Sequence, residues 1–168
     1  CKNKLKTVGL AYRLYLNDYD GVAPYEDPAT NYPTWIYHIM PYCAVPSDKL
    51  IGSMPYLEQL RCPMAQIDPS YYLYWYHTNY QINYWVISRP ALTKPDIAQK
   101  RPSETMALID GWGRDRLAHT SYLTGYPERI IEMCRHTQKA NTYFLDSHID
   151  TLTKDIPLVN TQAPWQTQ

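Results

Sequence analysis

The sequence lacks the features of a nucleic-acid-binding protein and of a membrane span. Its 168 residues contain 16 Lys plus Arg and 16 Asp plus Glu, so the formal net charge is zero. Neutralising phosphates requires a basic surface, and this balance therefore argues against nucleic acid as a partner. No segment approaches the roughly 18 to 20 consecutive apolar residues that a membrane-spanning helix needs.

Signatures of an enzyme are also missing. There is no G-x-S-x-G motif, and no serine or cysteine lies in a recognisable activating context. The five histidines are scattered along the chain. We therefore expect that the protein is not an enzyme.

The four cysteines form no C-x-x-C pair, which leaves the zinc-ribbon and thioredoxin-like interpretations without support. An even number of cysteines is compatible with disulfides in an oxidising compartment. Cys43 and Cys62 bracket a short segment with proline near both ends, and they are the preferred disulfide candidate. Buried free thiols are the alternative interpretation.

Phenylalanine occurs once, whereas there are 17 Tyr and 5 Trp. Tyr and Trp combine an apolar body with a polar tip and tolerate half-wet positions. They gather in residues 71–88, where we consider a binding surface for glycan or protein, or ordinary strand packing in which alternate residues point inward. The full cluster comprises Tyr71, Tyr72, Tyr74, Trp75, Tyr76, Tyr80, Tyr84 and Trp85. The candidate binding surface comprises Tyr72, Tyr74, Trp75, Tyr76, Tyr84 and Trp85.

The first 21 residues predict a helix over 2–19 that ends at Asp20-Gly21. Spacings of three and four predict one apolar face, widened by two further leucines. The face comprises Leu5, Val8, Tyr12, Leu16 and Tyr19, with Leu10 and Leu14 at its margin. The start has no cap and is rich in lysine, which is unfavourable for a helix dipole. We expect that this helix is the continuation of a longer one.

The remainder predicts one domain over 1–168 in the α+β class, with the helix on one face of an antiparallel sheet. Residues 22–70 are rich in proline and predict loops, with short helices at 34–40 and 55–60. Residues 71–156 predict the sheet, and the tail 157–168 is expected to be extended. Strands are expected within 71–88 and at 105–110, 142–146 and 148–152.

Two polar motifs allow more than one interpretation. His136, Asp146 and His148 are candidate ligands of a divalent metal, since imidazole and carboxylate are ordinary ligands. Alternatively, Asp146 caps a hairpin turn and His136 hydrogen-bonds to backbone near it. Asp110, followed by Gly111, ends a buried strand, where a carboxylate can be a ligand or catalytic group but is more often part of a turn.

Four short blocks together resemble one family, the pilin-like proteins of bacterial envelopes that carry a prepilin-type N-terminus and an "H-X9-DG" motif. In order along the chain, the blocks are residues 1–21, the Leu-Arg-Cys-Pro of 60–63, residues 80–83 with 101–111, and residues 135–148. Nine residues separate His136 from Asp146, as the motif's name describes. The family has Asp-Gly-His where this chain has Asp146-Ser147-His148, so serine stands in a turn where glycine would adopt positive φ at low cost.

The resemblance implies a long N-terminal helix, half in the inner membrane and half packed on an antiparallel sheet. It implies a structural or assembly subunit of a type II secretion pseudopilus or a type IV pilus-like machine, with other pilin-like subunits as partners through that helix. The expected location is the envelope, on its periplasmic or extracellular face. Two alternatives remain: an anchored binding module that uses the Tyr/Trp-rich surface, and a metal-binding accessory domain. Apart from a divalent metal, no cofactor is expected.

Overall fold

The computed structural model describes residues 1–25, 34–44, 62–65, 80–83, 86, 102–111, 117–118 and 134–153. Three helical segments belong to the described part: α1 (Lys2–Asp18), α2 (Thr34–Ile39) and the 3₁₀ helix η1 (Met40–Cys43). None of the helices in this part is long and apolar enough to cross a membrane. The prediction of a helix at 55–60, the extended tail 157–168 and most of the segment 71–88 lie outside the described residues.

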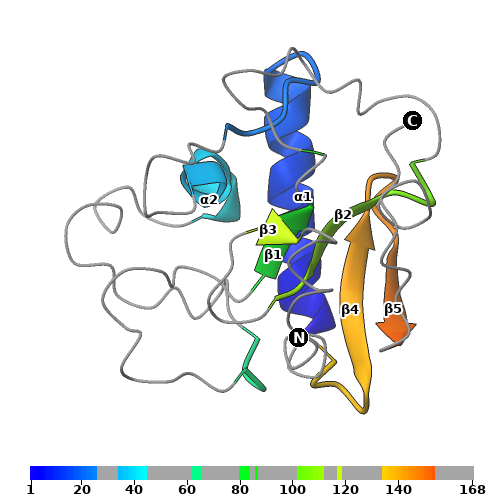
Figure 1. The fold of residues 1–168 in the computed structure, drawn as a ribbon. Helices are drawn as coiled ribbons and strands as arrows, with labels where there is room; N and C mark the ends of the chain where they lie inside the picture. Colours follow the sequence, from blue (N-terminus) through cyan, green and yellow to red (C-terminus); the bar gives the residue numbers. More distant parts are fainter. Residues whose placement is uncertain are drawn as a thin grey trace.

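The strands form one sheet in the order β3-β1-β2-β4-β5 (Figure 1). They are β1 (Tyr80–Asn83), β2 (Met106–Asp110), β3 (Leu117–Ala118), β4 (Lys139–Phe144) and β5 (Ile149–Thr153). Four of them pair antiparallel, and the two-residue β3 lies parallel to β1. The α+β class and the strands expected at 105–110, 142–146 and 148–152 are therefore confirmed, with β4 beginning a few residues earlier than expected.

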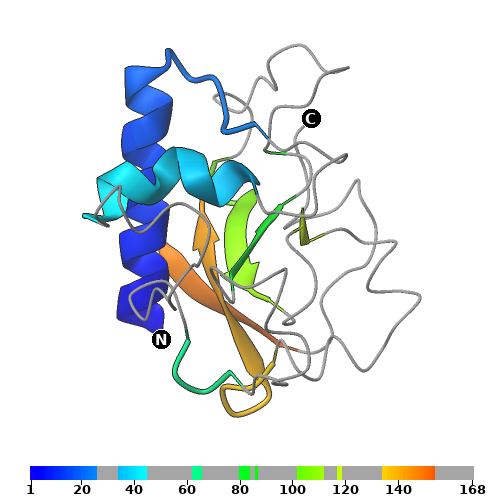
Figure 2. The ribbon, with the colours of Figure 1, turned by 90° about the vertical axis from the view of Figure 1, so that its left-hand side faces the viewer.

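Helix α1 lies along one face of the sheet and contacts β2 and β4 (Figure 2). Its buried face includes Leu5, Val8, Tyr12 and Leu16, as predicted. Three positions were predicted wrongly: Tyr19, expected on the face, is 51% exposed, and Leu10 and Leu14, expected at its margin, are 44% and 48% exposed. At about 100° per residue, Leu10 and Leu14 lie on the side of the helix opposite Val8 and Tyr12. Their spacing of four residues places them on the same side of the helix as each other, but this is not the buried side.

The helix and the sheet approach most closely at Gly9. A Cβ atom at this position would lie 2.4 Å from ring atoms of Tyr143, which is buried on β4. Glycine in a helix interior costs roughly 1 kcal/mol relative to alanine. Here the missing side chain makes room for the aromatic ring, which explains why the helix accepts that cost.

The short helices cover the C-terminal half of α1. Helix α2 crosses α1, and η1 follows it without a break (Figure 2). Trp35, Ile36, Ile39 and Met40 are fully buried in the same core cluster as the inner face of α1. The short helix predicted at 34–40 is therefore confirmed within the loop-rich region.

Candidate functional site

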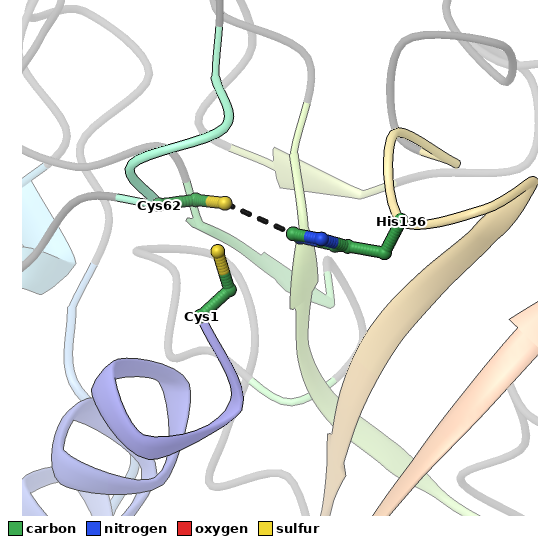
Figure 3. A group of neighbouring side chains, drawn as sticks. All are labelled: Cys1, Cys62 and His136. Atoms are coloured by element: carbon green, nitrogen blue, oxygen red, sulfur yellow. Dashed lines mark hydrogen bonds between the residues drawn. The ribbon is translucent and has the colours of Figure 1, made fainter.

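Three chemically active side chains meet beside the N-terminal end of α1. Cys1 precedes the helix, Cys62 begins the described segment 62–65, and His136 lies just before β4. Their ligand atoms all lie within 4.8 Å of one another, and the three side chains point toward one another (Figure 3). The Cys62 Sγ atom is 3.2 Å from His136 Nε2. Segments far apart in the chain thus build one cluster of sulfur and nitrogen donors.

The main chain holds His136 in a tight turn. His136 and Lys139 exchange two backbone hydrogen bonds of 3.1 Å, and the two residues between them have positive φ: 55° at Thr137 and 62° at Gln138. This is the pattern of a two-residue hairpin turn of type I′, which favours Asn and Gly at both central positions. A β-branched residue at positive φ is a strained choice. The turn therefore places His136 at a cost in backbone energy.

A fourth polar group, Asp110 at the end of β2, joins the cluster from the sheet. Asp110 is fully buried, and its Oδ2 atom is 3.2 Å from His136 Nε2. The same Oδ2 accepts hydrogen bonds of 2.7 Å from the backbone N–H and the side-chain amide of Asn141. Oδ1 is buried without a hydrogen-bond partner among the described residues. Asp110 is thus a buried carboxylate at the end of a strand, as predicted, and a turn after Gly111 would lie outside the described residues.

Burial shifts both titratable groups of the Asp110–His136 contact toward their neutral forms. Burial raises the pKa of Asp110 above its ordinary value, against the hydrogen bonds from Asn141 and the positive charge of Arg135. Burial also lowers the pKa of His136, although the nearby carboxylate acts in the opposite direction. Arg135 donates a hydrogen bond from Nη2 to the carbonyl oxygen of Gly111, which follows Asp110. The surroundings of this contact therefore penalise isolated charge, and the Arg135 guanidinium adds a positive charge beside Asp110.

The metal site predicted from His136, Asp146 and His148 does not form as a unit, and this prediction is corrected. His136 precedes β4 and Asp146 follows it, and a strand of six residues spans about 20 Å at roughly 3.4 Å per residue. His136 therefore contacts Asp110 and Cys62 instead. The alternative, in which His136 bonds to backbone near the Asp146 turn, fails for the same reason.

Asp146 and His148 form a local turn structure between β4 and β5. Asp146 Oδ1 accepts the backbone N–H of His148 at 3.1 Å and lies 2.5 Å from His148 Nδ1. The His148 ring stacks on Phe144, with the ring centroids 4.3 Å apart. Ser147 has φ 78°, so the position where the family has glycine is strained here. The prediction that Asp146 caps the hairpin turn is confirmed.

The predicted Cys43–Cys62 disulfide is not formed in the structure, where all four cysteines are free. Cys43 is buried at the end of η1, beside the core face of α1. Cys62 instead directs its sulfur toward His136. Burial raises the pKa of the Cys43 thiol to about 12, which makes it a poor nucleophile at neutral pH. The short sequence separation suggested this pair, but the packing places the two thiols in different environments.

The candidate binding surface of Tyr72, Tyr74, Trp75, Tyr76, Tyr84 and Trp85 lies outside the described residues. Tyr80, a member of the wider aromatic cluster, is described and lies in the core. Its hydroxyl donates a hydrogen bond of 3.3 Å to the carbonyl oxygen of Cys1. Tyr80 thus contacts the start of α1 from β1 and does not contribute to an exposed surface.

One signal in the sequence pointed to the cluster without revealing its geometry. The four blocks that carry the family resemblance each contribute one member: Cys1, Cys62, Asp110 and His136. Sequence reasoning used three of these residues separately and joined none of them to another. The chain matches no protein-family model, no curated protein and no solved structure.

Proposed function

We propose that this chain is the envelope-exposed domain of a pilin-like subunit, which assembles with other pilin-like subunits through α1. In this proposal the fibre is a type II secretion pseudopilus or a type IV pilus-like structure. The helix is anchored in the inner membrane through the segment that precedes it in the family. The observation that carries the proposal is that α1 buries one side in the fold and exposes apolar residues on the other.

The inner side of α1 is committed to the fold. Leu5, Val8, Tyr12 and Leu16 lie in the core cluster, and the Tyr12 hydroxyl donates a hydrogen bond of 2.9 Å to the carbonyl oxygen of Val86. Burying each aliphatic side chain of this kind contributes roughly 1.5 to 3 kcal/mol. The inner side therefore fixes α1 on the sheet and leaves the outer side available to a partner.

The outer side of α1 presents apolar residues to solvent. Leu10 and Leu14 are separated by one helical turn, and both are nearly half exposed. A helix packs on another helix through side chains three and four residues apart, and this pair has that spacing. The formal net charge of zero also means that identical copies carry no overall repulsion as they approach. Both features favour packing of α1 against the α1 of another subunit.

The test places a photo-crosslinking residue at Leu10 in the full-length protein, expressed in its own cells. The proposal expects cross-links between copies, or to other pilin-like subunits, in a ladder of increasing size. Leu14→Gln, which keeps the photo-crosslinking residue at position 10, is expected to abolish the ladder and to leave the fold intact, because the Leu14 side chain is nearly half exposed. Asn17→Gln is the matched control, since Asn17 lies on the same exposed side of α1 and receives the same residue.

The result that overturns the proposal is a dispersed monomer. If Leu10 gives no cross-link to a pilin-like chain while the protein is folded and anchored, α1 is not an assembly face. A monomer that instead retains a glycan or an unrelated protein fits the binding-module alternative. Circular dichroism of the Leu14→Gln variant shows whether a lost ladder reflects a lost interface or a lost fold.

A further inference from the structure

We propose that Cys1, Cys62, His136 and Asp110 form a tetrahedral metal site that takes Zn²⁺ and pins the N-terminal end of α1 to the sheet. The proposal does not depend on assembly through α1. It rests on the donor atoms, their spacing and the burial of the carboxylate.

The donor set suits zinc. Cysteine sulfur, histidine nitrogen and aspartate oxygen are its usual protein ligands, and four protein ligands are typical of a structural site. Two thiolates favour a soft or borderline metal over Mg²⁺ or Ca²⁺, which prefer oxygen. A site with four protein ligands and no open position is expected to stabilise the fold, with no role in catalysis.

The spacing of the donor atoms also fits. Tetrahedral bonds of about 2.0 to 2.3 Å place neighbouring ligand atoms roughly 3.3 to 3.8 Å apart. His136 Nε2 is 3.2 Å from Cys62 Sγ and 3.2 Å from Asp110 Oδ2. The three atoms of Cys1, Cys62 and His136 lie within 4.8 Å of one another. Asp110 lies outside this group of three, so its carboxylate must turn toward the two sulfurs to complete the coordination sphere.

The surroundings of Asp110 call for a cation. Its carboxylate is fully buried, and Oδ1, which is not the oxygen 3.2 Å from His136 Nε2, has no hydrogen-bond partner among the described residues. Leaving a charged oxygen in this condition is costly. Two thiolates and a carboxylate around a dication leave one negative charge, which the guanidinium of Arg135 balances from beside Asp110. The occupied site is then neutral as a whole.

A disulfide between Cys1 and Cys62 is the competing use of the two thiols. It would remove both sulfur donors and leave the buried Asp110 oxygen without a new partner. Within the cluster, His136 Nε2 would then keep Asp110 as its one remaining contact. The metal satisfies all four groups together, which is the physical reason to prefer it.

The site would join four segments that lie far apart in the sequence. Cys1 leads into α1, Cys62 and His136 come from two turns, and Asp110 ends β2. Cys62 and Asp110 are buried, whereas Cys1 and His136 are half-buried, so a metal can enter from their side. Binding would therefore couple the orientation of α1 to the sheet.

The test uses the whole chain, purified under strong reductant and without metal, and titrated with Co²⁺ as a spectroscopic substitute for Zn²⁺. The proposal expects one equivalent to bind. It also expects the visible bands of tetrahedral cobalt and a thiolate-to-cobalt charge-transfer band, both displaced by Zn²⁺. Cys62→Ala and His136→Gln are each expected to weaken Co²⁺ binding at least about 100-fold. Cys43→Ala, which removes a buried thiol outside the cluster, is expected to bind as the wild type does.

Three outcomes would overturn the proposal. The first is a folded wild-type chain that gives no thiolate-to-cobalt band. The second is a Cys1–Cys62 disulfide, found by mass spectrometry of unreduced protein isolated from its own cells. The third is metal binding that survives in both Cys62→Ala and His136→Gln. Because the first two use the wild-type chain, a variant that fails to fold does not leave the proposal untested.

Discussion

The two ends of α1 are held by different chemistry. At the N-terminal end, Cys1 meets Cys62 and His136 in a cluster of metal-ligand type. At the C-terminal end, the contacts are between rings: Tyr15 stacks on Tyr19 with centroids 4.2 Å apart and meets the Tyr42 ring edge-on at 6.2 Å. Thiol and imidazole groups therefore surround the N-terminal end, whereas aromatic rings pack at the C-terminal end.

This difference implies different responses to substitution. Each aromatic pair contributes roughly 0.5 to 1.5 kcal/mol beyond its buried area, so losses at the C-terminal end should be graded. A metal site depends on all of its ligands together, and losing one changes its affinity by orders of magnitude. We therefore expect that losing one ligand at the N-terminal end removes the contribution of the metal almost completely. Substitutions at the C-terminal end should instead lower the stability in small, separate steps.

The largest effect is expected from the metal itself. Zn²⁺ at a thousandfold excess over its Kd would stabilise the native chain by about 4 kcal/mol, and a chelator would reverse this. Differential scanning calorimetry, with and without Zn²⁺, measures the shift in Tm. Tyr42→Phe, at the opposite end, should keep the full zinc-dependent shift. Equal Tm values with zinc and with chelator would contradict a contribution of the metal at the N-terminal end.

Gly9→Ala, at a position between the two ends of α1, should give the next largest effect. The new methyl group would clash with the buried ring of Tyr143, at a cost of about 1 to 3 kcal/mol in unfolding free energy after the helix-propensity gain. Urea unfolding measures the loss. Asn17→Ala, at an exposed position in the same helix, should be neutral or slightly stabilising. A stabilised Gly9→Ala would show that α1 is not held tightly against β4.

The turns at the two ends of β4 allow a matched comparison of backbone strain. Gln138 precedes the strand and Ser147 follows it, with φ of 62° and 78°. Replacing either residue with glycine should stabilise the chain by about 1 kcal/mol, because glycine adopts positive φ without a steric cost. Thermal unfolding of the two variants gives the values. If Gln138→Gly stabilises the chain but weakens Co²⁺ binding, the rigid turn also orients His136.

The smallest effect is expected from Tyr42→Phe at the C-terminal end of α1. The Tyr42 hydroxyl donates a hydrogen bond of 2.7 Å to Asp18 Oδ2, and this bond raises the pKa of Tyr42 to about 12. The folded state therefore favours the protonated phenol. The resulting stability is fully present below the unfolded pKa of about 10 and is lost as the pH rises through about 12.

Unfolding free energies of the wild type and Tyr42→Phe, measured from neutral pH upward, should therefore converge across this alkaline window. The hydrogen bond is exposed, so the difference at neutral pH should be small. A gap that stays constant up to about pH 12 would mean that Tyr42 does not titrate as its contact with Asp18 requires.

Local patterns predicted the elements better than the site. The stripe from Leu5 to Leu16 identified the buried face of α1, and Asp146 was placed correctly at the β4–β5 turn. The nine-residue spacing between His136 and Asp146 was misleading as a sign of proximity, because most of it is an extended strand. The Cys43–Cys62 pairing failed for a related reason, since nearness along the chain says little about which way a side chain points.

The sequence by itself determined the periodicity of α1, the strands and turn of the β4–β5 hairpin, and hence the α+β class. These are local properties, because the side chains that define them lie within a few residues of one another. Only the tertiary structure decided that Cys1, Cys62, Asp110 and His136 meet, and that Leu10 and Leu14 face outward. Such contacts depend on how α1 lies on the sheet. Packing between distant segments, such as Gly9 against Tyr143, sets that arrangement, and no local pattern encodes it.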